Sequence, residues 1–353
     1  MENQLWQDIQ AQSGNLRSVV EHLYGQERSN IQAAATFLRN DRPIALVGIG
    51  SAEYLCMPAE TYLGQQGRFA STISASEAFY NLLPALKWAN IVINSRSGET
   101  IEVVKLCQAL KAENTPFVLI TNEPESTAAR LATHIIWTNT RKDLLVSINV
   151  VTAMMTATLV TAAAAVGKMD AVRPQLDHLL DQFASIVERA SLRAQEIADF
   201  FDSIRPIYLL SRGCTSGAAF CGRLVLEEVA RYPSVALDAA EFRQGPNEVV
   251  DERFGCILFL LSGFQGQLSQ SLSQDIQKSG GKVLTVGHCA AASGPQELQF
   301  PIVGIDDFLL PVASVVPVQV LAYKLAEKQG YQPGDVRYIS KVITSEQGIP
   351  NQR

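Results

Sequence analysis

The stretch Arg42-Pro-Ile-Ala-Leu-Val-Gly-Ile-Gly50 decides the fold, because a related stretch, Arg205-Pro-Ile-Tyr-Leu-Leu-Ser-Arg-Gly213, begins 163 residues further along the chain (Arg42 to Arg205). In both copies a short apolar run leads to a glycine, which is typical of a buried strand that turns into the helix of a βα unit. A repeat of this kind indicates a duplicated unit. The sequence therefore predicts two similar α/β halves.

Further apolar runs alternate with amphipathic stretches in both halves. In the first half we expect strands at Ile44–Gly48, Ile91–Asn94, Phe117–Ile120 and Ile135–Trp137. In the second half we expect them at Ile207–Leu210, Cys256–Leu261, Lys282–Val286 and, with a weaker pattern, Gln299–Val303. This alternation predicts two flavodoxin-like parallel sheets flanked by helices, with the ligand site near the carboxyl ends of the strands.

The chain divides by pattern into four segments. We expect an N-terminal helical segment over 1–29, a first domain over 30–168, connecting helices over 169–200, and a second domain over 201–353 that ends in an active-site tail. The connecting segment carries apolar residues at helical spacing, from Leu176 to Val187.

Composition excludes several classes of protein. The 353 residues are 47% hydrophobic and 18% charged, as expected of a folded chain rather than a disordered one. A net charge of -6 and the lack of a basic stripe argue against nucleic acid as a partner. The uncharged stretch from Asn149 to Gly167 is rich in Thr and Ala, so we interpret it as a core helix and expect no membrane partner.

Cofactor and metal motifs are missing from the sequence. The six cysteines form no CxxC pair, and the N-terminus does not resemble a targeting signal, so we expect a reducing, cytoplasmic location. Glu53 stands where a dinucleotide fingerprint would have its third glycine. We therefore expect neither a metal nor an organic cofactor.

The richest polar loop is Asn94-Ser-Arg-Ser-Gly-Glu-Thr100, between a predicted strand and a predicted helix. Hydroxyls and backbone N–H groups at a helix N-terminus bind anions, which makes a phosphate site or a simple helix cap the two explanations. Ser51, which follows the preceding βα turn, points to the same end of the sheet. The corresponding loop of the second half, from Ser262, has one hydroxyl where the first has three, which predicts one phosphate site per chain.

In these motifs the chain resembles the double-SIS phosphosugar enzymes. It is similar to the isomerase half of glucosamine-6-phosphate synthase and to related deaminases and deglycases. The resemblance rests on Gly48–Ser51, Ser95–Thr100, Gly222–Pro246 and the tail from Val316 through Lys341. It implies that the two predicted domains are SIS domains and that the chain forms a homodimer with a shared active site.

The resemblance also implies roles for individual residues. Those expected to hold the sugar phosphate are Ser51, Ser95, Arg96, Ser97, Thr100 and, more weakly, Ser147. Glu228 corresponds to the general base that moves a proton between C1 and C2 through an enediol or enamine. Lys341 corresponds to the C-terminal lysine that stabilises oxyanion charge or assists ring opening.

Two positions depart from the family pattern. Gln244 stands where the synthase's isomerase half has a histidine credited with ring opening, and an amide cannot shuttle a proton near neutral pH. Val225 replaces a motif lysine. No glutaminase domain fits before Arg42, so we expect no ammonia delivery from glutamine.

The expected function is therefore isomerase or deaminase chemistry on a 6-phosphorylated amino sugar. A ketosamine-6-phosphate deglycase is a close alternative, and a non-catalytic sugar-phosphate sensor is an alternative of another class. Whether Arg96 or Arg243 contacts the ligand stays open at this stage.

Overall fold

The structure is a computed structural model, and it describes residues 3–202, 204–289, 294–338, 340 and 342–346. Within these residues the chain forms two compact units, each built around a five-stranded sheet. The first-sheet unit comprises Gln12–Asp177 together with the tail from Val336 on. The second-sheet unit comprises His178–Asp335 together with the residues up to Ala11.

The first sheet is parallel throughout, and its strands lie in the order β2-β1-β3-β4-β5. Its strands are β1 (Ile44–Gly48), β2 (Ala70–Ser74), β3 (Asn90–Asn94), β4 (Phe117–Thr121) and β5 (His134–Trp137). This is the flavodoxin-like order, in which ligands bind where the chain switches direction across the sheet.

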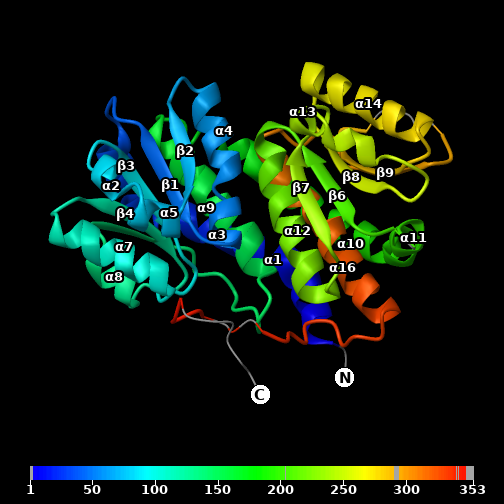
Figure 1. The fold of residues 1–353 in the computed structure, drawn as a ribbon. Coiled ribbons are helices and arrows are strands. Elements are labelled where there is room, and N and C mark those ends of the chain that lie inside the picture. The colour runs from blue at the N-terminus through cyan, green and yellow to red at the C-terminus, as the bar shows by residue number, and fades with distance from the viewer. Residues whose placement is uncertain (1–2, 203, 290–293, 339, 341, 347–353) are drawn as a thin grey trace. The chain divides into compact units, whose positions relative to one another are not determined.

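The second sheet repeats this arrangement, with the order β7-β6-β8-β9-β10 and parallel pairing throughout (Figure 1). Its strands are β6 (Ile207–Ser211), β7 (Ser234–Asp238), β8 (Gly255–Leu260), β9 (Lys282–Gly287) and β10 (Glu297–Pro301). The equivalent order of the two sheets confirms the predicted fold class and the duplication.

Helices cover both faces of the first sheet. The helices that begin before residue 165 are α1 (Gln4–Tyr24), α2 (Arg28–Leu38), α3 (Ser51–Tyr54), α4 (Met57–Gln65), α5 (Ala75–Tyr80), α6 (Leu83–Leu86), α7 (Ile101–Ala112), α8 (Thr127–Leu131) and α9 (Asn149–Ala165). Alternate residues of β1 separate the two faces: Ala45 and Val47 pack with α5 to α8, while Ile44 and Leu46 lie with α2, α4 and α9.

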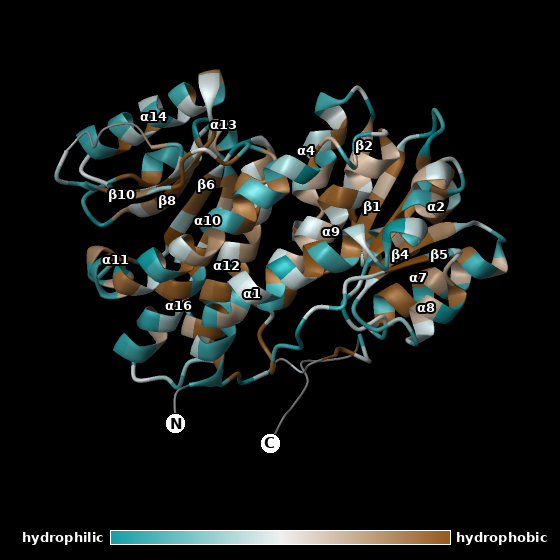
Figure 2. Cartoon of the chain, turned by 180° about the vertical axis from the view of Figure 1, so that it is seen from behind, coloured by the Kyte–Doolittle hydropathy of each residue, from teal (hydrophilic) through white to brown (hydrophobic). Residues whose placement is uncertain are grey.

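The second sheet is covered in the same way. Its helices are α10 (Arg173–Leu192), α11 (Ala194–Phe200), η1 (Gly213–Thr215), α12 (Ser216–Ala230), α13 (Ala239–Phe242), η2 (Pro246–Val249), α14 (Gly263–Lys278), α15 (Leu310–Ser314) and α16 (Val316–Lys328). One core joins α13 and α14 to β8, and α12 packs with α16 on the other face. Figure 2 shows apolar residues gathered on the strands and polar ones along α14.

Two predicted helical stretches are observed. The segment from Asn149 forms α9, and every one of its residues is buried, which confirms that it is a core helix. Helices α10 and α11 occupy the predicted connecting segment, where the side chains from Leu176 to Val187 that were singled out are buried. One further stretch of the described residues, Leu310–Lys328, is apolar and long enough to cross a membrane. However, 89% of its most apolar 18-residue segment is buried inside the protein.

The tail lies with the first sheet, although it was predicted as part of the second domain. The backbone N–H of Ile101 donates to the carbonyl of Ile343 (3.0 Å). The Nζ of Lys105 lies 2.5 Å from Oε2 of Glu346. These bonds explain why the tail belongs to the first-sheet unit rather than to the sheet that precedes it in the sequence.

Candidate phosphosugar site

The polar loop between β3 and α7 folds around its own hydroxyls. Ser95 is buried, and its backbone N–H donates to the carbonyl of Ile120 (3.1 Å), which fixes the start of the loop against β4. The Oγ of Ser95 accepts from the N–H of Gly98 (3.1 Å), and the Oγ of Ser97 accepts from the N–H of Glu99 (3.2 Å). The loop is therefore held in one conformation by short local bonds.

Gly98 is required by this conformation for two reasons. Its φ of +62° lies in the left-handed region. A Cβ at this position would lie 2.0 Å from Oγ of Ser126 and 2.6 Å from its Cβ. The carbonyl of Gly98 also accepts from the N–H of Ala128 (3.0 Å), so the loop and the start of α8 pack directly on one another.

Thr100 is the N-cap of α7 and has an extended backbone, but its side chain makes no capping hydrogen bond. The hydroxyl therefore stands at the N-terminus of a 12-residue helix without serving the helix itself. A helix N-terminus presents unsatisfied N–H groups and the positive end of the helix dipole, which favours an anion. This arrangement suits a phosphate group.

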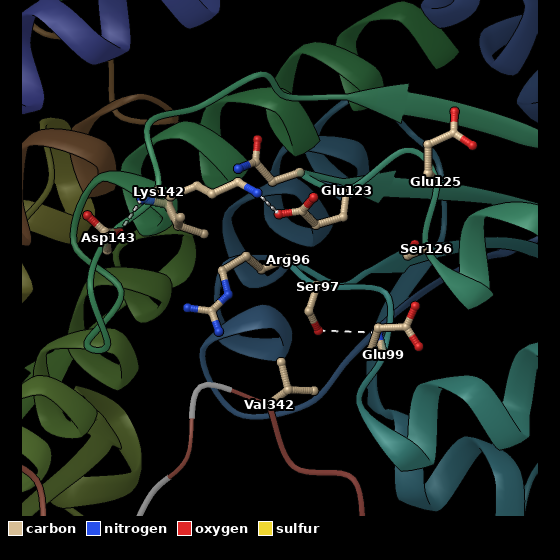
Figure 3. Close-up of a pocket in the computed structure, with 11 residues that line it drawn as sticks. Arg96, Ser97, Glu99, Glu123, Glu125, Ser126, Lys142, Asp143 and Val342 are labelled. Carbon is tan, nitrogen blue, oxygen red and sulfur yellow. Dashed lines mark hydrogen bonds and ion pairs between the residues drawn. The ribbon is translucent and has the colours of Figure 1, made fainter.

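A cavity of about 360 Å³ opens beside this loop, within the usual size range of ligand pockets (Figure 3). Its walls come from the loop, from the segment that follows β4, from the segment before α9 and from the tail. The residues that line it are Arg96, Ser97, Glu99, Asn122, Glu123, Glu125, Ser126, Lys142, Asp143, Val150 and Val342.

Arg96 connects the loop to two neighbouring segments. Its carbonyl accepts from the N–H of Asn122 (3.1 Å) and from the hydroxyl of Thr121 (3.2 Å). Its Nη1 lies 3.4 Å from Oγ of Ser147. These bonds place the Arg96 guanidinium at the cavity, as Figure 3 shows.

The other charges of the cavity are largely matched by partners within the protein. Lys142 pairs with Glu123 (Nζ–Oε1 2.6 Å). Asp143 is 2% exposed and accepts four hydrogen bonds, from the N–H groups of Ile148, Asn149 and Val150 and from the side chain of Asn149. Burial raises the pKa of the Asp143 carboxyl, and the four donors oppose that shift. Asp143 therefore acts as the cap of α9.

The predicted phosphate-binding residues all lie in the first-sheet unit, but only some of them line the cavity. Arg96 and Ser97 line the cavity. Ser51 is the first residue of α3, directly after Gly50, and it is not part of the lining, nor are Ser95, Thr100 and Ser147.

The predicted catalytic residues lie elsewhere in the sequence. Glu228 is half-buried on α12, in the second-sheet unit. Gln244 is exposed in the run between α13 and η2. Lys341 lies outside the described residues. Val225, at the position of the family lysine, is 5% exposed and packs inside the unit.

The loop of the second sheet that corresponds to Ser97 and Gly98 is Ser262-Gly263, and Gly263 has the same φ of +62°. Here a carboxylate of the protein occupies the N-terminus of the helix: Asp307 accepts from the backbone N–H (2.9 Å) and the hydroxyl (2.8 Å) of Ser262. His288 lies beside it (Nε2–Oδ1 3.3 Å). An internal anion thus takes the place that a phosphate would take in this half.

Several cavity residues were not predicted. Asn122, Glu123, Glu125 and Ser126 follow β4, and Lys142 and Asp143 follow β5. The signal was available, because polar residues directly after a buried parallel strand reach the same edge of the sheet as the predicted loop. Among the described residues, no group of three or more His, Cys, Asp or Glu side chains could hold a metal ion.

Comparison with known families assigns the first half. Residues 37–164 match the family model described as SIS domain. They form an SIS domain. The loop, the cavity walls before α9 and all five strands of the first sheet lie within this match.

Most of the chain is similar to curated relatives that are longer than it. It is 22% identical over 340 residues to a glutamine–fructose-6-phosphate aminotransferase (isomerizing) of Pyrococcus horikoshii, which covers 94% of this chain and 56% of the relative. The chain thus spans about half the length of this curated relative, which bears out the resemblance to its isomerase half.

Solved structures show the same fold. The C-terminal domain of glucosamine-fructose-6-phosphate aminotransferase from Francisella tularensis superposes with a TM-score of 0.83 at 19% identity, covering 94% of this chain and 97% of that one. Glucosamine-6-phosphate deaminase from Thermotoga maritima superposes with a TM-score of 0.77 at 19% identity, covering 97% and 99%.

Proposed function

We propose that this protein is a phosphosugar isomerase or deaminase that acts on a 6-phosphorylated amino sugar by proton transfer between C1 and C2. The observation that carries the proposal is the loop from Ser95 to Thr100, which presents hydroxyls, Arg96 and a left-handed glycine at the N-terminus of α7, inside an SIS domain. This combination of short donors and a helix N-terminus favours phosphate binding.

The cavity beside the loop supports an amine on the sugar. Its lining contains four carboxylates and two cations; Glu123 is paired with Lys142 and Asp143 caps α9, which leaves Glu99 and Glu125 against the single cation Arg96. An excess of carboxylates disfavours a second anion and suits a protonated amine or hydroxyl groups. The phosphate would therefore lie on the hydroxyl side of the loop, and the rest of the sugar toward the cavity.

Glu228 is the proposed base, with Lys341 and Gln244 as further catalytic groups contributed to a site shared by two subunits of a cytoplasmic homodimer. The matched control for Glu228 is its neighbour Glu227, whose Oε1 lies 3.6 Å from Nη1 of Arg223. The two carboxylates are one residue apart on α12, about 100° around the helix, so only one can face a given site.

The experiment is proton NMR in D₂O with glucosamine 6-phosphate, fructose 6-phosphate and a fructosamine 6-phosphate. We expect deuterium at C1 or C2 of at least one of them, lost in Glu228→Gln and kept in Glu227→Gln. Both variants should keep the affinity of the native protein for the sugar phosphate. Exchange that survives in Glu228→Gln would contradict the assignment of the base.

The two alternatives give distinct outcomes in the same experiment. Released amine from the fructosamine 6-phosphate, with no interconversion of the other two, would identify a deglycase. Saturable binding without any exchange would identify a sensor, which Gln244 in place of the family histidine favours.

A further inference from the structure

Two contacts join the described part of the tail, up to Glu346, to the region that follows the phosphate loop. The first is the backbone bond from Ile101 N–H to the Ile343 carbonyl (3.0 Å). Ile101 is the first residue of α7, so this N–H has no partner within the helix. The tail therefore satisfies a donor at the N-terminus that follows the phosphate loop.

The second attachment is a cluster of three side chains. Oε2 of Glu346 accepts from Nζ of Lys105 on α7 (2.5 Å) and from the hydroxyl of Tyr80, the last residue of α5 (2.6 Å). Nζ of Lys105 also donates to the Tyr80 hydroxyl (3.1 Å). The hydrogen bond to Glu346 raises the pKa of Lys105, and its counterpart lowers the pKa of Glu346, so both are charged over a wide pH range.

Between the predicted lysine position and these attachments, Val342 forms part of the cavity wall, where it faces Arg96 and Ser97 (Figure 3). The tail residues from Ile343 to Glu346 are exposed, so burial of apolar surface contributes little to holding them. The hydrogen bonds and the ion pair are the observed contacts that fix this segment to α5 and α7. A charge-assisted pair of this kind is stronger than an ordinary surface salt bridge because Tyr80 fixes its geometry.

We propose that Glu346 is a positioning residue: it latches the tail onto α7, and the latched tail is the wall that retains the sugar phosphate at the loop. The second half of this statement rests on the proposed function. Loss of the latch opens the cavity at Val342 and shortens the residence time of the ligand, while the chemistry of the loop itself is unchanged.

Hydrogen–deuterium exchange of the full chain tests the latch without any ligand. The Ile101 amide reports directly on the docked tail, because it donates to the Ile343 carbonyl (3.0 Å). We expect Glu346→Gln to raise its exchange rate by up to about fivefold, because the pair is exposed to solvent, and Lys105→Glu to raise it further by like-charge repulsion. The charge-swapped double variant Lys105→Glu/Glu346→Lys should return it to within about threefold of the native rate. Lys111→Glu, the same change at the other end of α7, is the matched control and should leave it unchanged.

Titration calorimetry with glucosamine 6-phosphate and fructose 6-phosphate tests the wall. We expect binding about three- to tenfold weaker in Glu346→Gln, restored in the charge-swapped variant. Unchanged exchange at Ile101 in both single variants would overturn the latch. Faster exchange with equal or tighter ligand binding would overturn the wall. If the native protein binds neither sugar phosphate, the proposed function and the retention role fail together, and the exchange result still decides whether Glu346 holds the tail.

Discussion

Replacing Gly98 by alanine is expected to destabilise the protein in two ways, through backbone strain and through a steric collision of the added Cβ. Gly98 and Gly263 occupy corresponding positions of the two halves and share a φ of +62°. An added Cβ at Gly98 would lie 2.0 Å from Oγ of Ser126, whereas one at Gly263 would meet nothing within 4 Å. The two substitutions therefore share the backbone strain, and only the first adds a collision.

The magnitudes follow from these contacts. A left-handed residue other than glycine costs about 1–2 kcal/mol, which is the whole cost expected for Gly263→Ala. At Gly98 the Ser126 Cβ, at 2.6 Å, must also move, which moves the start of α8 as well as a side chain. Overpacking of this kind costs about 1–3 kcal/mol, so Gly98→Ala should destabilise by about 2–5 kcal/mol in total.

Urea unfolding followed by fluorescence measures both variants in the same way. Trp88 and Trp137 lie in the first-sheet unit and Trp6 in the second-sheet unit, so each variant has a reporter in its own unit. Because the two units need not unfold together, the transitions are compared unit by unit. Gly98→Ala should also lose most of its affinity for sugar phosphates, since the loop cannot keep its conformation.

Two results would refute this reasoning. Equal losses of stability in Gly98→Ala and Gly263→Ala would show that the contact with Ser126 is not the cause. The double variant Gly98→Ala/Ser126→Gly removes the colliding atoms and should recover part of the loss, even though Ser126 also accepts the capping bond from Ala129. If the effects of the two substitutions on the free energy of unfolding are strictly additive, the contact with Ser126 is likewise not the cause.

Three further predictions concern stability. The hydrogen bond to Asp307 raises the pKa of His288 above its ordinary value of 6.5. The protonated His288 therefore contributes fully to the free energy of unfolding below pH 6.5, and this contribution is lost as the pH rises through the raised pKa. Unfolding of the native protein should show this fall, and Asp307→Asn should lack it. Asp143→Asn places an amide against four donors and should lower the free energy of unfolding by about 2–3 kcal/mol, a loss that denaturant titration would detect and that an unchanged midpoint would contradict. Gly14→Ala, inside α1 with open space around it, should raise the melting temperature through a gain of about 0.5–1 kcal/mol, and a lower melting temperature would count against this.

The sequence predicts the central strands and one edge strand of each sheet, and it misses the other edge strand. Runs such as Ile44–Gly48 and Gly255–Leu260 are buried on both faces, and burial on both faces requires a continuous apolar run that is easy to recognise. The missed strands are β2 in the first half and β7 in the second. Each lies at one edge of its sheet and is mostly half-buried, so Ala70–Ser74 and Ser234–Asp238 contain Ser, Thr and Asp that mimic a loop.

The candidate site was predicted in its first loop and missed in its surroundings. The hydroxyl pattern from Ser95 to Thr100 is local, so the sequence alone reveals it. The ion pair of Lys142 with Glu123 and the contact of the tail with Lys105 join segments that are distant in the sequence. Residue spacing along one chain does not encode such contacts, because they depend on which strand neighbours which.

The two ends of the chain each belong to the unit built by the opposite half of the sequence. The first sheet leaves the ribosome early, but the segment that docks on its α7 follows the second sheet in the sequence and is synthesised after both sheets. During translation the SIS domain must therefore wait, with the Ile101 amide and the Lys105 ammonium exposed to water, until the tail from Val336 emerges. A protein cut between the two halves would lose this closing segment from the first-sheet unit, although the two halves share one architecture.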